Sequence, residues 1–159
     1  MSDELRNAWE PIDREIAQQV GIDADIFVSL INLESKFDPN ALASDGSSGI
    51  AQIQPKFHQV DVWDAYASLW YSARLLRQYH DEWGRWDMAL ASYNAGITAV
   101  SMKGSIPLNG RTELFVARIL SDAIGMRTIV PCAPTPKIDY DLTDTMSVWM
   151  SMTIALVGR

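Results

Sequence analysis

The sequence predicts an all-α (mainly α) domain of about six to seven helices enclosing a cleft, and three observations support this class. Apolar residues recur every three or four positions in several segments, which is the helical period. Gly, Pro and Asp residues stand where helix ends are expected. No segment reads convincingly as a strand. The chain of 159 residues, 48% hydrophobic, fits one domain with a packed core.

The first two helices are predicted from their end signals. Pro11 is tolerated in the first turn of a helix over residues 11–20, and Gly21 ends it. Asp23 is a suitable N-cap for a second helix over residues 24–35, and Pro39 prevents much continuation.

The middle of the chain is predicted to contain a loop and further helices. Residues 38–49 are dense in turn formers, and we expect a helix to resume near Ile50. Apolar spacing then predicts helices at 64–83 and 87–95, each followed by a glycine, and at 114–124. Turn residues in 97–111 predict a loop before this last helix.

The chain divides into a predicted domain at 1–128, a Pro/Asp-rich linker at 129–145 and an apolar C-terminal segment at 146–159. The apolar run in this segment has about twelve residues, whereas a helix needs about twenty to span a bilayer. We expect the segment to dock on a partner subunit or on the domain itself, with membrane contact as the less favoured alternative.

Composition excludes several classes of function. The net charge is −7 and no basic run exceeds two residues, which disfavours nucleic acid as a partner. Cys132 is the only cysteine, so no intrachain disulfide forms. His58 and His80 lie in no metal-binding motif, and we predict neither a metal nor a cofactor. The N-terminus lacks the pattern of a signal peptide.

Glu34 is the first candidate for chemistry. Phe27, Leu30 and Ile31 lie seven, four and three residues before it, so they share its face of the predicted helix. A carboxyl group among such side chains is desolvated, which raises its pKa towards that of a general acid. The alternative is a helix-terminal glutamate that turns to solvent.

Three blocks of sequence share the order and spacing of one catalytic domain. The first is Glu34-Ser35 with Phe37 and residues 39–41; the second is Ser44, Gly46, Gly49-Ile50, Gln52 and Pro55; the third is Ala91-Ser92-Tyr93-Asn94-Ala95-Gly96, followed by Phe115-Val116. They resemble the catalytic domain of the soluble lytic transglycosylases, a lysozyme-like family, over roughly residues 22–122.

This resemblance implies a catalytic mechanism. The enzyme would cleave the MurNAc-β-1,4-GlcNAc bond of peptidoglycan, with Glu34 protonating the leaving oxygen. Glu34 would then take a proton from the MurNAc C6 hydroxyl as a 1,6-anhydro ring closes. Tyr93 would be the second catalytic residue, with its hydroxyl hydrogen-bonded to Glu34, unless it is a core tyrosine.

The resemblance also implies substrate-binding residues. Gln52 would contact substrate amides or orient Glu34, and Asn94 would bind substrate or tie a helix to a loop. A hydroxyl of Ser44 or Ser48, or a backbone amide, would bind an N-acetyl group, unless these residues only form a turn. Gln54 and Phe115 complete the set.

Three positions depart from the family pattern. Gln54 replaces the usual methionine, Phe115 replaces the common tyrosine, and Arg111 stands where many members have a glutamate that Glu113 could replace. The tryptophans could stack on sugars, although core packing is their ordinary use. They are Trp63, Trp70, Trp83 and Trp86.

Two other functions remain open at this point. A lysozyme-like muramidase would use Asp38 or Asp45 to activate water. An inactive virion structural or ejection protein would keep only the fold. We expect a phage virion protein acting in the bacterial periplasm or cell wall, or a periplasmic component of a secretion system, with partner proteins bound through the C-terminal segment.

Overall fold

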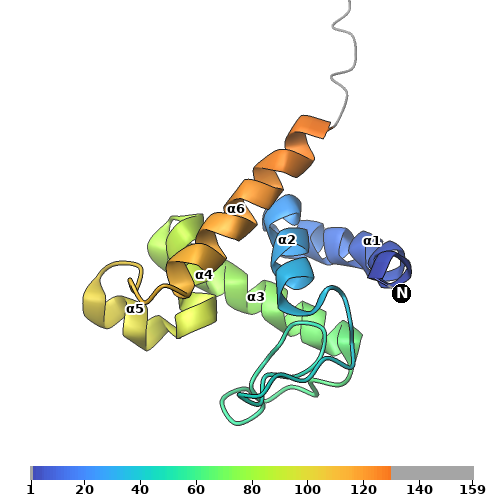
Figure 1. Ribbon diagram of the computed structural model, residues 1–159, viewed down its shortest axis with the longest axis horizontal. Coiled ribbons are helices and arrows are strands. Elements are labelled where there is room, and N and C mark those ends of the chain that lie inside the picture. The colour runs from blue at the N-terminus through green and yellow to red at the C-terminus, as the bar shows by residue number, and fades with distance from the viewer. Residues whose placement is uncertain (1, 130–159) are drawn as a thin grey trace, which may run out of the picture.

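The computed structural model describes residues 2–129, which form helices joined by loops (Figure 1). No strand occurs within these residues; two isolated bridges join Ser48 to Leu42 and to Ile53. The all-α prediction is therefore confirmed. The helices are α1 (Ser2–Val20), α2 (Ala24–Ser35), α3 (Ala65–Trp83), α4 (Trp86–Ala95), α5 (Ile97–Lys103) and α6 (Thr112–Ile129).

Helix α2 is the central element, with α1 and α6 packed against it (Figure 1). The Asp23 carboxylate accepts hydrogen bonds from the Asp25 and Ile26 amides, which caps the helix as predicted. All six residues from 26 to 31 are buried, so α2 is surrounded by protein along its middle turns. This burial fixes the position of the residues at its C-terminal end.

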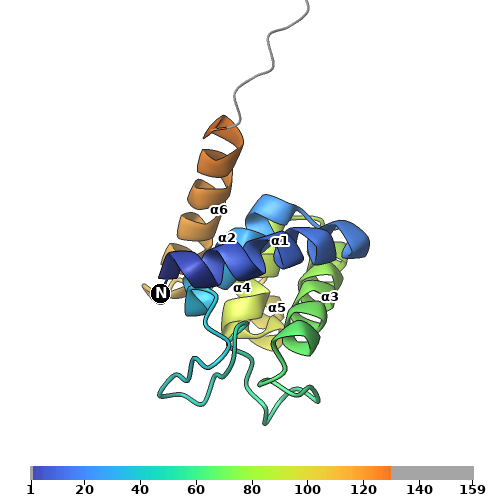
Figure 2. The same cartoon turned by 90° about the vertical axis from the view of Figure 1, so that its right-hand side faces the viewer.

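Helices α3 and α4 form the second part of the core. The Asp64 carboxylate caps α3 at its start, and Gly84 ends the helix in the left-handed region, as the glycine after residue 83 predicted. Helix α4 packs against α3, α5 and α6. The long loop between α2 and α3 extends from one end of the helical body (Figure 2).

Helix α1 begins at Ser2 rather than at Pro11, so the predicted start was wrong. Pro11 lacks an amide hydrogen and lies inside the helix at the cost of one backbone hydrogen bond. Leu5 and Trp9 pack against the core, and Arg6 pairs with Glu10. These contacts stabilise the turns before Pro11.

The helix predicted to resume near Ile50 is absent, because residues 50–63 form turns and bends. Gln52 adopts a positive φ of 49°, which a helix does not allow. Conversely, the predicted loop at 97–111 contains the short helix α5, bounded by Gly96 and Gly104. Among its seven residues only Val100 is buried, so the apolar periodicity of this segment is too weak to predict a helix.

Helix α6 runs from Thr112 to Ile129, beyond both ends of the predicted 114–124. Ile129, assigned to the linker from the sequence, is thus helical. The rest of the predicted linker and the apolar segment 146–159 lie outside the described residues. Within residues 2–129, no helix combines the length and the hydropathy that crossing a bilayer requires.

Candidate active site

The site begins at the C-terminal end of α2, where Glu34 occupies the last turn. Lys36 and Phe37 follow in the left-handed region, with φ of 55° and 64°, and reverse the chain sharply. Phe37 is fully buried and therefore anchors this reversal. Because the helix ends beside the loop, Glu34 faces the loop across a cavity.

Side chains from two helices form hydrogen bonds to the loop beside Glu34. The Ser35 hydroxyl donates to the Ile50 carbonyl at 2.6 Å, and the Tyr93 hydroxyl of α4 donates to the Ala51 carbonyl at 3.0 Å. The Gln52 side-chain amide donates to the Ala41 and Gly49 carbonyls at 3.2 and 3.0 Å. These bonds satisfy carbonyls that a helix would otherwise use, and they explain why residues 50–52 form a turn.

Gly49 is required at the base of this loop. Its φ is +72°, and a Cβ there would lie 1.9 Å from the Val62 carbonyl oxygen. Its amide also donates to the Ala41 carbonyl at 2.8 Å. The loop is therefore closed by a backbone approach that only glycine permits.

The cavity has a volume of about 250 Å³ and lies between the end of α2, the loop, α3, α4 and the residue before α6. Its walls combine aromatic side chains with carboxyl, amide and guanidinium groups. The lining residues that matter below are Glu34, Asp45, Gln52, Gln54, Tyr93 and Arg111.

Glu34 has the electrostatics of a general acid. Burial raises its pKa from 4.5 to about 8; the Arg111 cation lowers the pKa and the Asp45 carboxylate raises it. A glutamate with this pKa holds its proton at neutral pH, in the range useful for proton transfer. The desolvation expected from the apolar face of α2 is therefore confirmed.

Tyr93 lines the same cavity, but its hydroxyl donates to a loop carbonyl and not to Glu34. Its hydroxyl donates to Ala51, whereas the sequence led us to expect a bond with Glu34. Burial raises the pKa of Tyr93 well above 10, and Glu34 adds to this rise. The phenol thus stays neutral, and its oxygen can still accept a hydrogen bond from the Glu34 acid.

A hydrogen-bond network joins the end of α4 to the start of α6. The Asn94 side-chain oxygen accepts from the Thr112 hydroxyl at 3.0 Å, and the Asn109 side-chain oxygen accepts from the Arg111 and Thr112 amides. Asn94 thereby has a structural role, but it ties α4 to the first residue of α6, whereas the sequence led us to expect a tie between a helix and a loop. The network places Arg111 at the cavity wall.

Glu113 does not take the place of the glutamate that Arg111 replaces. Its carboxylate accepts the Asn109 and Gly110 amides at 3.1 and 2.6 Å, which caps the start of α6. It is absent from the cavity lining. Arg111 therefore brings a cation to this wall.

The structure brings some of the predicted binding residues together and separates others. Gln52, Gln54 and Asn94 line the cavity. Ser44 is exposed outside the lining, and the buried Ser48 donates its hydroxyl to the Gly46 carbonyl. Phe115 packs against the core instead of lining the cavity. The roles assigned to these residues remain predictions.

Sequence reasoning missed several lining residues. Ser47, rather than Ser44 or Ser48, reaches the cavity from the loop. Phe57 and His58, to which no role was assigned, also line it, and Phe57 is 72% exposed. A large apolar residue within a Pro-containing turn was the only signal for Phe57 in the sequence. Of the tryptophans, Trp70, Trp83 and Trp86 pack against the core, whereas Trp63 is half exposed.

These features define a class of protein. A small helical domain with a desolvated glutamate at a helix end, facing a loop across a cavity of polar and aromatic groups, is suited to cleaving a glycan strand by acid catalysis. Within residues 2–129, no cluster of three or more His, Cys, Asp or Glu residues could hold a metal ion.

The family comparison identifies this class more closely. The sequence model of the Transglycosylase SLT domain matches residues 12–111. The chain therefore belongs to the SLT transglycosylase domain family, the peptidoglycan-degrading transglycosylases of lysozyme-like type. The match covers Glu34, the loop, Tyr93 and Arg111.

Proposed function

We propose that this protein is a lytic transglycosylase that cleaves the MurNAc-β-1,4-GlcNAc bond and leaves a 1,6-anhydroMurNAc end. The observation that carries this proposal is the half-buried Glu34, which lines the cavity and whose pKa of about 8 keeps it protonated at neutral pH. The domain also belongs to a family that degrades peptidoglycan. One such carboxyl suffices for the reaction, because the attacking oxygen comes from the substrate itself.

The mechanism uses Glu34 twice. The Glu34 acid gives its proton to the glycosidic oxygen, the C1–O bond breaks, and its electron pair leaves with the GlcNAc hydroxyl. The positive charge develops at MurNAc C1. The Glu34 carboxylate then removes the proton of the C6 hydroxyl as that oxygen bonds to C1. This step restores the acid, and no water is consumed.

Tyr93 in the cavity lining and Ser35 beside it support this cycle by position. Tyr93 fixes the Ala51 carbonyl and keeps a neutral hydroxyl near Glu34, and Ser35 fixes the adjacent Ile50 carbonyl. These bonds hold the loop against the catalytic end of α2, so the cavity keeps its shape between turnovers.

A muramidase is the second candidate, because Asp45 lines the same cavity as Glu34. Hydrogen bonds from Ser47 lower the pKa of Asp45, so the cavity holds one protonated and one ionised carboxyl group. An acid paired with a base is the arrangement of inverting hydrolases. Asp38 does not line the cavity. Its carboxylate accepts a hydrogen bond from the Asn40 amide.

The test compares Glu34→Gln with Asp45→Asn on purified peptidoglycan in ¹⁸O-labelled water. We expect unlabelled anhydro-muropeptides from the wild type and from Asp45→Asn, and none from Glu34→Gln. Labelled reducing ends that disappear in Asp45→Asn would assign the protein as a hydrolase. A correctly folded wild type that releases no fragments would contradict both enzymatic functions and favour an assembly protein.

We further propose that the protein opens the cell wall locally as part of a phage virion or, alternatively, a periplasmic secretion system. Support comes from a small acidic catalytic domain followed by a Pro/Asp-rich stretch and an apolar segment at 146–159, suited to docking on a partner. Truncation after Ile129 should abolish incorporation into the particle or complex and leave peptidoglycan cleavage intact. Equal incorporation of the truncated chain would contradict this role.

A further inference from the structure

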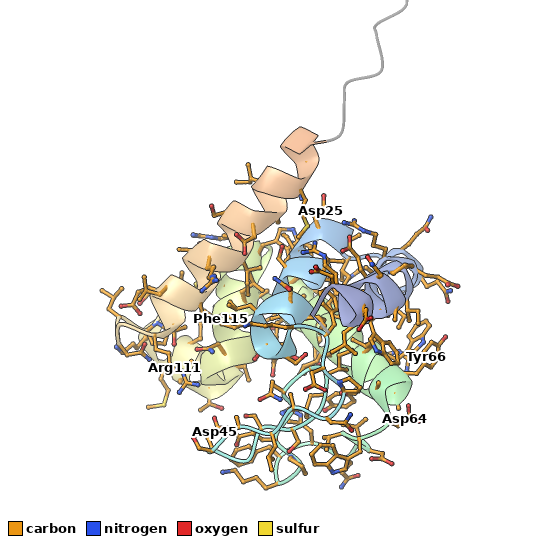
Figure 3. All side chains as sticks on the ribbon, turned by 45° about the vertical axis from the view of Figure 1, so that its right-hand side comes forward. Asp25, Asp45, Asp64, Tyr66, Arg111 and Phe115 are labelled. Carbon is orange, nitrogen blue, oxygen red and sulfur yellow. The ribbon has the colours of Figure 1, made fainter. Side chains whose placement is uncertain are left out.

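Arg111 is a charged group of the cavity lining that the proposed reaction does not use. The Asn109 side chain fixes its backbone just before α6, and its side chain joins Glu34 and Asp45 in the cavity lining. Figure 3 shows Arg111 and Asp45 on the same side of the molecule, one just before α6 and the other in the loop. The guanidinium thus lies on a surface accessible to the substrate.

The Arg111 cation has no ion-pair partner in the part of the chain that the structure describes. Within residues 2–129, no carboxylate forms an ion pair with its guanidinium, whereas Arg14, Arg77 and Arg85 each pair with one. Asp45 is the ionised carboxylate of the cavity lining, and hydrogen bonds from Ser47 together with the Arg111 charge lower its pKa. Its carboxylate accepts the Ser47 amide at 3.0 Å and lies 3.5 Å from the Gln54 amide nitrogen, so its own loop engages it.

Glu34 does not compete for Arg111 either, because its pKa of about 8 leaves it uncharged at neutral pH. The cavity therefore presents a planar guanidinium with free donors. Such a group binds carboxylates through two parallel hydrogen bonds, which gives both orientation and affinity.

We propose that Arg111 is a specificity-determining residue that binds a carboxylate of the peptidoglycan strand and thereby positions the strand over Glu34. This inference rests on the proposed function. Peptidoglycan offers carboxylates of two origins: the lactyl group of MurNAc in strands without peptides, and the stem peptide where one is attached. Both present the same chemistry to the guanidinium, and uncharged glycans of the same linkage present none.

The test measures binding in a Glu34→Gln background, which prevents turnover. Three ligands are titrated calorimetrically: a (GlcNAc-MurNAc)₂ tetrasaccharide without peptides, the same strand with stem peptides, and chitotetraose, which has no carboxylate. Arg111→Gln is compared with Arg111→Lys and with Arg118→Gln, an exposed arginine of α6 outside the cavity lining. Circular dichroism confirms that each variant is folded.

We expect Arg111→Gln to weaken binding of carboxylate-bearing strands about tenfold to a hundredfold, without effect on chitotetraose. Arg111→Lys should restore part of the affinity, and Arg118→Gln should bind as the parent does. A loss confined to the peptide-bearing strand would assign the stem peptide as the source of the carboxylate. A loss confined to the peptide-free strand would assign the lactyl carboxylate, because that group is an amide once a stem peptide is attached. A loss for both strands would mean that the guanidinium binds a carboxylate of either origin.

Three results would overturn the inference. Equal weakening of all three ligands would mean that Arg111 only shapes the cavity, and unchanged affinities would mean that it contacts no substrate. Both leave the proposed function intact, since the parent still binds the strands. Failure of the parent to bind any glycan would instead contradict the proposed function, and the inference with it.

Discussion

Asp13 provides the sharpest test of the energetics of this fold. It lies in α1, four residues after Trp9 and three and four residues before Ile16 and Ala17, which pack in the core. It is fully buried, and neither carboxyl oxygen has a hydrogen-bond partner. Asp13 thus places a carboxyl group at a position of α1 where the helical period predicts an apolar residue.

Burial raises the pKa of Asp13 from 3.8 to about 8; the Glu10 carboxylate adds to the rise and Arg14 opposes it. Between these two values the folded state keeps a proton that the unfolded chain has lost. The free energy of unfolding therefore falls as pH rises through this window, by about 1.4 kcal/mol per pH unit. The full loss is about 6 kcal/mol, complete above pH 8.

Asp13→Asn removes this titration and keeps the shape of the side chain. We expect the difference in unfolding free energy, variant minus wild type, to increase by about 3 kcal/mol between about pH 5 and about pH 7.5. Urea denaturation followed by circular dichroism measures it at each pH. The change in this difference, not its absolute value, is the readout, because a buried amide has its own unsatisfied groups.

Glu34 has a pKa raised to about the same value, so it lowers stability in the same pH window. It is present in both proteins and cancels in the difference. Repeating the comparison in a Glu34→Gln background should give the same increase of about 3 kcal/mol. A difference that stays constant within about 0.5 kcal/mol over this range would refute the argument that Asp13 is protonated in the folded state.

Three further predictions concern the site. The kcat/KM for anhydro-muropeptide release should fall above about pH 8 as Glu34 loses its proton, and a rate still rising at higher pH would contradict its role as the acid. Tyr93→Phe leaves the buried Ala51 carbonyl unpaired and should cost about 1–3 kcal/mol in urea denaturation; unchanged stability would show that the bond is dispensable. Gly49→Ala should destabilise the fold by more than about 2 kcal/mol, because its Cβ would collide with the Val62 carbonyl. Gly46→Ala is the matched control: it shares a positive φ but meets no atom within 4 Å, so equal losses would exclude the collision as the cause.

Local signals account for the elements that the sequence predicted well. Helices α2 and α3 begin at aspartate caps and end at residues in the left-handed region, and each carries an apolar stripe. Such signals act within a few residues of the chain, so a sequence reader can detect them. The desolvation of Glu34, which raises its pKa, followed from the same period, because its face of α2 carries Phe27, Leu30 and Ile31.

Contacts between distant residues decided the elements that the sequence mispredicted. Residues 50–52 form a turn because Ser35 and Tyr93, from two different helices, take their carbonyls as hydrogen-bond acceptors. The turns of α1 before Pro11 persist because Leu5 and Trp9 pack against the core. No propensity of the local sequence reports these interactions.

The sequence by itself determined the helical class, the family and the candidate acid. Periodicity, helix caps and the order of motifs depend only on the order of residues along the chain. Only the tertiary structure decided what faces Glu34. Arg111 and Asp45 lie far apart in the sequence but line the same cavity. The Tyr93 hydroxyl donates its hydrogen bond to the Ala51 carbonyl. Charge and hydrogen bonding depend on distances in space, and packing of α2 against α1 and α6 sets those distances.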